Sequence, residues 1–190
     1  MKGIVYQSIL ITGPKHSGKS LSARALGKIM GCDSVDLDEV IEKQTGKTPR
    51  ALFIEGPEIF KKAEALALAS LIQGRQRQRF RIISAGGGLI DNSEALALLS
   101  MRREIIVAYL DVSAETAWQR IARSAAGGEL PPFLNTPKPK ETHLALHERR
   151  AGAYKALALI TISAEDKSPE EIAQEIAERL EPSHSGMISQ

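Results

Sequence analysis

The sequence predicts an α/β protein with a parallel, doubly wound sheet and helices on both faces of that sheet. Short apolar runs alternate along the chain with longer stretches of helical periodicity, which is the pattern of such a sheet. The run at residues 105–110, IIVAYL, is almost entirely apolar, as expected of a strand that is covered on both faces. The first run, at residues 8–12, leads directly into a glycine-rich loop and then into a helical stretch.

The predicted strands are short apolar runs, most of them bounded by polar or glycine residues. They span residues 8–12, 34–37, 81–85, 104–110 and 157–163. The predicted helices span residues 19–30, 38–45, 57–74, 93–102, 114–124, 142–153 and 168–180. Ser113, Thr142 and Ser168 are candidate N-caps, because a hydroxyl at that position accepts a hydrogen bond from a first-turn N–H. Pro169 then suits the first helical position.

Length and composition restrict the class of protein. The 190 residues are enough for one domain with a core and short for two. With 25 basic and 23 acidic residues, the formal charge of +2 does not favour nucleic acid or a membrane as the main partner. The single cysteine, Cys32, excludes an internal disulfide framework and fits a reducing compartment. No apolar stretch is long enough for a membrane span or typical of a signal peptide, so we expect a cytoplasmic protein.

Residues 13–20, GPKHSGKS, match the Gly-x-x-x-x-Gly-Lys-Ser phosphate-binding loop and lie between a predicted strand and a predicted helix. Gly13 and Gly18 let successive backbone N–H groups turn toward phosphate oxygens, and the helix adds its N-terminus. Lys19 is placed to reach the β- and γ-phosphates, and the hydroxyl of Ser20 to ligate Mg²⁺. The alternative, a glycine-rich turn with an unrelated lysine, leaves the flanking strand and helix unexplained.

Two other predicted strands end in residues that suit a ligand site. The second ends in Asp36-Leu37-Asp38 and the third in the triplet Gly86-Gly87-Gly88. Ligands of doubly wound sheets bind beyond the carboxyl ends of the strands. The aspartates are therefore candidates for Mg²⁺ contact and proton abstraction, and the glycines for backbone contact with a small ligand. Taken alone, the aspartates suit helix capping better than a ligand site, and the glycines also suit a flexible turn.

A proline- and glycine-rich segment at residues 125–140 interrupts the alternation of strands and helices. Here we expect a lid that excludes water from the site, with a surface insertion as the alternative. We expect residues 1–180 to form one domain and residues 181–190 a flexible tail. The basic run at residues 75–81 suits a solvated connection after a helix better than a nucleic-acid site, so we expect no nucleic-acid partner.

Over residues 8–180 the chain resembles the shikimate kinase family, whose members combine the phosphate loop with a further series of motifs in a fixed order. That order makes the resemblance more specific than the loop alone. The matching segments are Asp36-Leu37-Asp38, Ile41-Glu42, Thr45-Gly46, the stretch GPEIFKKAE at 56–64, Gly86-Gly87-Gly88, Arg150 with Tyr154, and Asp166-Lys167-Ser168-Pro169.

The resemblance implies a three-layer P-loop kinase fold with a lid and a five-stranded parallel sheet in the order 2-3-1-4-5. It also implies transfer of the γ-phosphoryl group of ATP, with Mg²⁺ as cofactor, to the 3-hydroxyl of shikimate in aromatic amino-acid biosynthesis. We expect the chain to act as a monomer. A kinase for another small hydroxy acid, such as gluconate, is the alternative enzyme. A nucleotide-binding protein that has lost turnover is the alternative without catalysis.

The resemblance also implies roles for single residues. Asp38 would bind the acceptor hydroxyls and serve as the catalytic base, with Lys19 as the catalytic cation. Ser20 would serve Mg²⁺, and Asp36 would help to hold the Mg²⁺ shell through water. The implied nucleotide-binding residues are Gly13, Ser17, Gly18, Lys19, Ser20, Lys167 and Arg123, which would stack on adenine, with Arg120 as a weaker candidate. The implied substrate-binding residues are Asp38, Lys61, Gly87, Gly88 and Arg150, whose guanidinium would hold a carboxylate.

Two positions depart from the family pattern. Lys61 stands where the family has a second carboxylate-binding arginine, so the charge is kept but the bidentate fork is lost. Pro131 stands where the family's lid has an arginine that reaches the phosphates and the substrate. Losing such a cation costs orders of magnitude in phosphoryl transfer. Either Lys15, Lys138 or Lys140 replaces it, or the chain is slow, altered in substrate or inactive.

Overall fold

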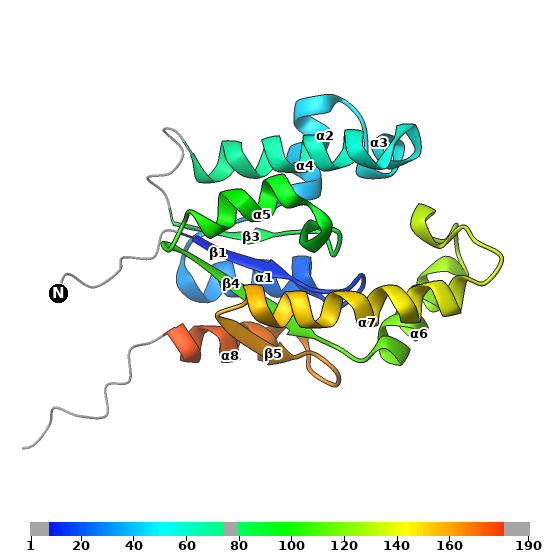
Figure 1. Cartoon of the computed structure of the whole chain (residues 1–190). Coiled ribbons are helices and arrows are strands. Elements are labelled where there is room, and N and C mark those ends of the chain that lie inside the picture. Colours follow the sequence, from blue (N-terminus) through cyan, green and yellow to red (C-terminus); the bar gives the residue numbers. More distant parts are fainter. Residues whose placement is uncertain (1–7, 74–79, 181–190) are drawn as a thin grey trace, which may run out of the picture.

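Five parallel strands form the centre of the protein in a computed structural model that describes residues 8–73 and 80–180 (Figure 1). They pair in the order β2-β3-β1-β4-β5, which confirms the predicted parallel sheet and its strand order. The strands are β1 (Ser8–Thr12), β2 (Asp33–Asp36), β3 (Arg81–Ser84), β4 (Ile105–Asp111) and β5 (Ile160–Ser163). All residues of the central strand β1 are buried.

Helices connect the strands and cover the sheet. They are α1 (Lys19–Met30), α2 (Leu37–Thr45), α3 (Pro49–Glu55), α4 (Pro57–Ile72), α5 (Ser93–Ser100), α6 (Ala114–Ala125), α7 (Pro139–Leu157) and α8 (Pro169–Leu180). Two single-turn 3₁₀ helices, η2 (Leu89–Asp91) and η3 (Pro132–Leu134), lie in the connections. Within the described ranges, no helix is long and apolar enough to cross a membrane.

The core lies on both faces of the sheet because successive residues of a strand point to opposite sides. In β1, Leu10 packs among residues of α2, α4 and α5, whereas Ile9 and Ile11 pack among residues of α1 and α8. Figure 1 shows α4 and α5 on one side of the sheet and α1 and α8 on the other. A separate cluster that includes Tyr109 and Tyr154 joins β4 to α7. The expected three-layer architecture is therefore present.

The boundaries of α7 differ from the prediction. The helix begins at Pro139 rather than at residue 142, because proline suits the first turn, where its missing N–H is not needed. The predicted N-cap at Thr142 is wrong, since this residue lies inside the first turn and its hydroxyl donates to the carbonyl of Lys138 at 3.0 Å. The helix continues to Leu157, so β5 begins at Ile160 and not at residue 157.

Helix α3 was not predicted, although the sequence carries its start signal. Thr48 is the N-cap and accepts from the N–H of Ala51, and Pro49 takes the first helical position. The predicted cap at Ser113 is confirmed by a hydrogen bond from the N–H of Thr116 at 3.1 Å. At the start of α8, the hydroxyl of Ser168 likewise accepts from a first-turn N–H, at 3.2 Å.

The proline- and glycine-rich segment at 125–140 is packed against α3. Leu134, within η3, is fully buried. Arg50 of α3 donates to the carbonyl of Leu130 at 3.0 Å and forms an ion pair with Glu129. The segment therefore follows a defined path beside the cavity described below. The expected flexible tail at 181–190 and most of the basic run lie outside the described residues.

Candidate active site at the carboxyl ends of the strands

A cavity of about 1240 Å³ lies where β1, β2 and β3 end. Its walls come from the phosphate loop, the start of α2, the glycine triplet, α7 and the segment that contains Pro131. The position agrees with the rule that ligands of such sheets bind beyond the carboxyl ends of the strands. The phosphate loop, the aspartates at the start of α2 and the glycine triplet, which are far apart in the sequence, therefore line the same cavity.

The phosphate loop has the backbone conformation that its motif requires. Gly13 has a φ of 150°, and a Cβ at this position would lie 2.6 Å from the carbonyl oxygen of Leu110, so no other residue fits. His16 also has a positive φ, of 60°, which is uncommon for a residue with a side chain. Such turns let neighbouring N–H groups converge on an anion. Ser17 is buried inside the loop, and Gly18 caps α1.

Lys19, at the first position of α1, folds back over the loop. Its Nζ donates to the carbonyl of Pro14 at 2.6 Å, which holds the ammonium group against the phosphate loop. Removal of the ammonium from water, together with the nearby charge of Lys15, lowers the pKa of Lys19 to about 8, although Asp38 and Asp36 oppose the shift. A bound anion would therefore stabilise the charged form of Lys19.

Ser20 and Asp36 meet across the site. The Ser20 hydroxyl donates to Oδ2 of Asp36 at 2.6 Å and lies 3.2 Å from the hydroxyl of Ser84. The other carboxylate oxygen of Asp36 accepts the N–H of Asp38 at 3.0 Å and caps α2. The capping role of Asp36 is confirmed, and its second oxygen, which accepts from Ser20, stays a predicted contact for the Mg²⁺ shell.

Asp38 lines the cavity from the first turn of α2. Burial and the neighbouring carboxylate of Asp36 raise its pKa above the ordinary value, while Lys15 and Lys19 act in the opposite direction. A carboxylate with a raised pKa is a better proton acceptor than an exposed one. The position and environment of Asp38 suit a general base.

The glycine triplet lies against the phosphate loop. A Cβ on Gly87 would come within 2.8 Å of the carbonyl oxygen of Gly13, so the close approach of the two segments requires glycine. The hydroxyl of Tyr154 donates to the carbonyl of Gly87, and its ring stacks on Tyr109 with centroids 4.8 Å apart. Gly87 and Gly88 both line the cavity. Helix α7 therefore fixes the triplet in place.

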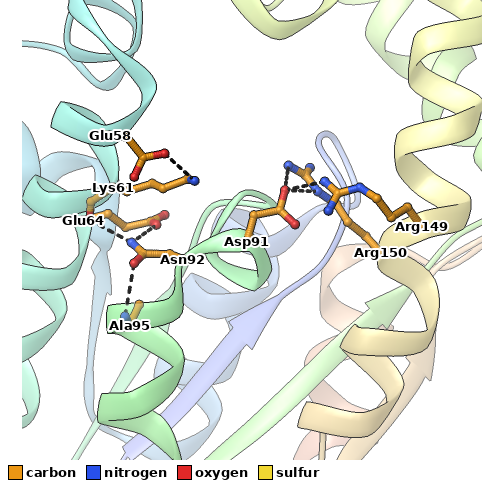
Figure 2. Close-up of polar contacts among 8 residues, drawn as sticks. All are labelled: Glu58, Lys61, Glu64, Asp91, Asn92, Ala95, Arg149 and Arg150. Carbon is orange, nitrogen blue, oxygen red and sulfur yellow. Dashed lines mark hydrogen bonds and ion pairs between the residues drawn. The ribbon is translucent and has the colours of Figure 1, made fainter.

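Charged side chains from α4, η2 and α7 line the cavity and lie near one another (Figure 2). Arg150 of α7 donates from Nε and Nη2 to Oδ2 of Asp91, at 2.9 and 2.6 Å. Arg149 donates to the same oxygen at 2.8 Å. Lys61 of α4 lies on the opposite wall and pairs with Glu58 at 2.8 Å. The predicted pair Arg150 and Lys61 thus lines one cavity, with partners that the sequence did not indicate.

Glu64 is a buried carboxyl group that was not predicted as a site residue, although it closes the matching stretch 56–64. Its Oε2 accepts from Nδ2 of Asn92 at 2.9 Å, and its Oε1 has no partner among the described residues. A Cβ on Gly86 would lie 3.7 Å from Glu64 Oε1 and 3.9 Å from Asp38 Oδ1. Burial raises the pKa of Glu64 to about 7, against the hydrogen bond from Asn92.

Replacing Glu64 with glutamine is expected to change how stability depends on pH. The folded-state pKa of about 7 exceeds the ordinary 4.5, so the protonated group stabilises the fold below pH 4.5, and this contribution is lost as pH rises through 7. The loss amounts to roughly 3 kcal/mol. Urea unfolding at several pH values should show this fall for the parent and a flatter profile for Glu64→Gln. The exposed Glu42→Gln is the control, and an equal fall in all three proteins would contradict the assignment.

The two arginines predicted for adenine, Arg120 and Arg123, have different surroundings. Arg123 is exposed on α6. The guanidinium of Arg120 donates to the carbonyl of Ala164 at 3.1 Å and to that of His16 in the phosphate loop at 3.4 Å. Lys167, in the connection after β5, forms an ion pair with Glu175. The helical pattern alone could not separate the two arginines, because both lie near the end of the same helix.

The three lysines proposed to replace the lid arginine have different environments. Lys138 is exposed and pairs with Glu141 at 2.9 Å, within the start of α7. Lys140 pairs with Glu115 of α6, also at 2.9 Å. Lys15 lines the cavity from the phosphate loop. The arrangement favours Lys15 as the additional cation.

Comparison with known proteins agrees with this arrangement. The family model described as shikimate kinase matches residues 15–181. A shikimate kinase of Vibrio parahaemolyticus is 32% identical over 176 residues, which cover 92% of this chain and 96% of that protein. The structure of shikimate kinase from Acinetobacter baumannii in complex with shikimate has a TM-score of 0.80 at 27% identity and matches 93% of each chain. A gluconokinase from Sinorhizobium meliloti, at 15% identity and a TM-score of 0.58, shares the fold.

Proposed function

The chain belongs to the shikimate kinase family, and from this membership we propose that it transfers the γ-phosphoryl group of ATP to the 3-hydroxyl of shikimate. One observation carries the proposal: a single cavity joins a phosphate-binding loop to Arg150, with Asp38 on its wall. The first feature suits ATP, the second a carboxylate, and the third a hydroxyl that must lose its proton. A related kinase with shikimate bound supports the choice of acceptor.

In the proposed reaction, the acceptor oxygen forms a bond to the γ-phosphorus as the bond from that phosphorus to the β,γ-bridging oxygen breaks and ADP leaves. Asp38 takes the proton of the hydroxyl, and the charge of Lys19 faces the β- and γ-phosphates. The transition state needs little covalent help, so catalysis comes mainly from positioning and charge stabilisation. Gly87 and Gly88 line the acceptor site with backbone, and Arg150 orients the acid.

Ser20 and Asp36 fit a Mg²⁺ ion. Their oxygens are 2.6 Å apart, and a hydroxyl and a carboxylate are the hard ligands that this ion prefers. Mg²⁺ usually keeps several waters and the nucleotide's own oxygens, so Ser20 as a ligand and Asp36 through a water suffice. When bound, it neutralises charge on the transferred phosphoryl group. We place adenine against Arg120, since its guanidinium is fixed beside the phosphate loop.

A coupled assay of ADP release tests the function. The parent protein is given ATP, Mg²⁺ and one acceptor at a time: shikimate, gluconate or another small hydroxy acid. The proposal expects turnover with shikimate at a higher kcat/KM than with any other acceptor. Preference for gluconate would support the alternative kinase. Binding of ATP without transfer to any acceptor would support the non-catalytic alternative, to which Pro131 points.

Replacing Arg150 with alanine is expected to raise the KM for shikimate by at least roughly tenfold, because a charge-assisted bidentate contact is lost. The KM for ATP should change little. Lys61→Arg is expected to lower the KM for shikimate, since it restores a fork on the opposite wall. Lys155→Ala removes a cation from the same helix outside the cavity and serves as the control. Equal effects of Arg150→Ala on both substrates would place Arg150 elsewhere.

A further inference from the structure

Asp91 is a carboxylate of the protein itself that lines the cavity beside Arg149 and Arg150 (Figure 2). Its Oδ2 accepts three hydrogen bonds, two from Arg150 and one from Arg149, at 2.6–2.9 Å. The side chains of Asp91 and Arg150 are 21% and 18% exposed, so this ion pair is screened less than a surface pair. Asp91 is therefore held on the cavity wall and not in bulk solvent.

The contact has the chemistry that an acceptor's carboxylate would use. The edge formed by Nε and Nη2 of a guanidinium is one of the two that bind a carboxylate side-on. Arg150 uses this edge for Asp91, which also partly neutralises its charge. An anionic acceptor must then bind the other edge beside a negative charge or displace Asp91. Either course weakens the binding of an acid relative to an arginine without this partner.

Asp91 neutralises its arginine partners more strongly than Glu58, on the opposite wall, neutralises Lys61. Lys61 also pairs with an acid, Glu58, but the side chain of Glu58 is 83% exposed. An exposed pair of this kind contributes little and opens readily. Burial acts to raise the pKa of Asp91, but the hydrogen bonds and charges of Arg149 and Arg150 outweigh it and hold the pKa below the ordinary value. Asp91 is therefore ionised at neutral pH.

We propose that Asp91 is a specificity-determining residue, which competes with the acceptor's carboxylate for Arg150 and Arg149. It weakens the binding of anionic acceptors. The difference in affinity between an acid and its uncharged analogue is therefore smaller than it would be without Asp91. The inference rests on the proposed function, because it takes Arg150 as the residue that binds the acceptor's carboxylate.

The geometry offers a substitution that removes the charge and keeps the contacts. All three hydrogen bonds end on one oxygen of Asp91, and asparagine also presents one acceptor oxygen. Asp91→Asn therefore retains an acceptor for both guanidinium groups. Glu94→Gln, at an exposed position in the first turn of α5, removes an equal charge outside the cavity and is the matched control. Asp91→Ser is the second variant if thermal unfolding shows that the asparagine protein is not folded.

The test measures binding by calorimetry with two probes, shikimate and its methyl ester, and turnover by ADP release. Asp91→Asn is expected to lower the Kd and KM for shikimate by roughly four- to tenfold, as expected for one carboxylate charge near another. The Kd of the ester and the KM for ATP should not change, and Glu94→Gln should match the parent. Unchanged or weaker shikimate binding by Asp91→Asn would overturn the inference and leave Asp91 as a support for the guanidinium groups.

The outcomes separate this inference from the proposed function. If the parent binds but does not phosphorylate shikimate, and Asp91→Asn binds it more tightly, then the function fails and the role of Asp91 stands. If the parent phosphorylates shikimate and the variant shows no gain, the function stands and the inference fails. If neither protein binds shikimate, both fail.

Discussion

Replacing Lys19 with alanine is expected to lower turnover by at least about 10²-fold, the scale of removing one preorganised charge from a closed site. ATP should also bind more weakly, because the lost ammonium group faces the β- and γ-phosphates. The structure holds this group over the loop by its hydrogen bond to the carbonyl of Pro14 at 2.6 Å. A flexible lysine would lose entropy on binding ATP, but this one is already in place.

The ligand-free fold is not expected to depend on Lys19. Its pKa, lowered to about 8, means that the folded protein holds this proton less tightly than the unfolded chain does. The charged form therefore destabilises the fold, and this penalty fades as pH rises from 8 toward the ordinary value. Thermal unfolding of Lys19→Ala without nucleotide should occur at a temperature no lower than that of the parent.

The same pKa provides a specific signature in ATP binding. Calorimetry should show that the parent binds ATP less tightly as pH rises above about 8, because free Lys19 loses its proton there. Lys19→Ala should lack this dependence. Lys28→Ala, at an exposed position on the same helix, is the control. Unchanged ATP affinity in a folded Lys19→Ala protein would contradict the assignment of Lys19 to the phosphates.

The sequence predicted best those parts of the molecule that local signals define. β1 and α1 have the predicted bounds, since an apolar run defines the strand and Gly18 and Gly31 define the ends of the helix. The strand-end rule also predicted that Ser20 and Asp36 lie in one site, and Ser20 Oγ is 2.6 Å from Asp36 Oδ2. Here backbone topology alone places the side chains.

The sequence could not predict which tertiary partner a side chain would choose. In the sequence, Asp91 is a single acidic residue shortly after the glycine triplet. No local sequence pattern indicates its contact with Arg149 and Arg150, which come almost 60 positions later. The burial of Glu64 likewise depends on α4 lying against the triplet. The segment at 125–140 has the composition of a loop, yet Leu134 is fully buried. Each feature arises from packing between elements that are distant in the sequence.

Replacing Asp38 with asparagine is expected to lower kcat by roughly 10²–10⁴, the range of general-base catalysis. The substitution keeps the shape of the side chain and its place in the first turn of α2, but removes the acceptor of the hydroxyl proton. The cap of the helix should survive, because Asp36 and not the side chain of Asp38 provides it. ATP affinity should largely be retained, because Lys19 and the loop are unchanged.

The pH profile distinguishes a base from a residue that only binds the acceptor. Burial and the charge of Asp36 raise the pKa of Asp38, so kcat/KM of the parent should fall as pH drops through this raised value, where the carboxylate becomes protonated. Asp38→Asn has no such group and should lose this limb of the profile. Glu39→Gln, the next residue on α2 with a side chain 71% exposed, is the matched control and should keep the limb. Normal turnover by Asp38→Asn, or an acid limb that persists in it, would show that another group takes the proton.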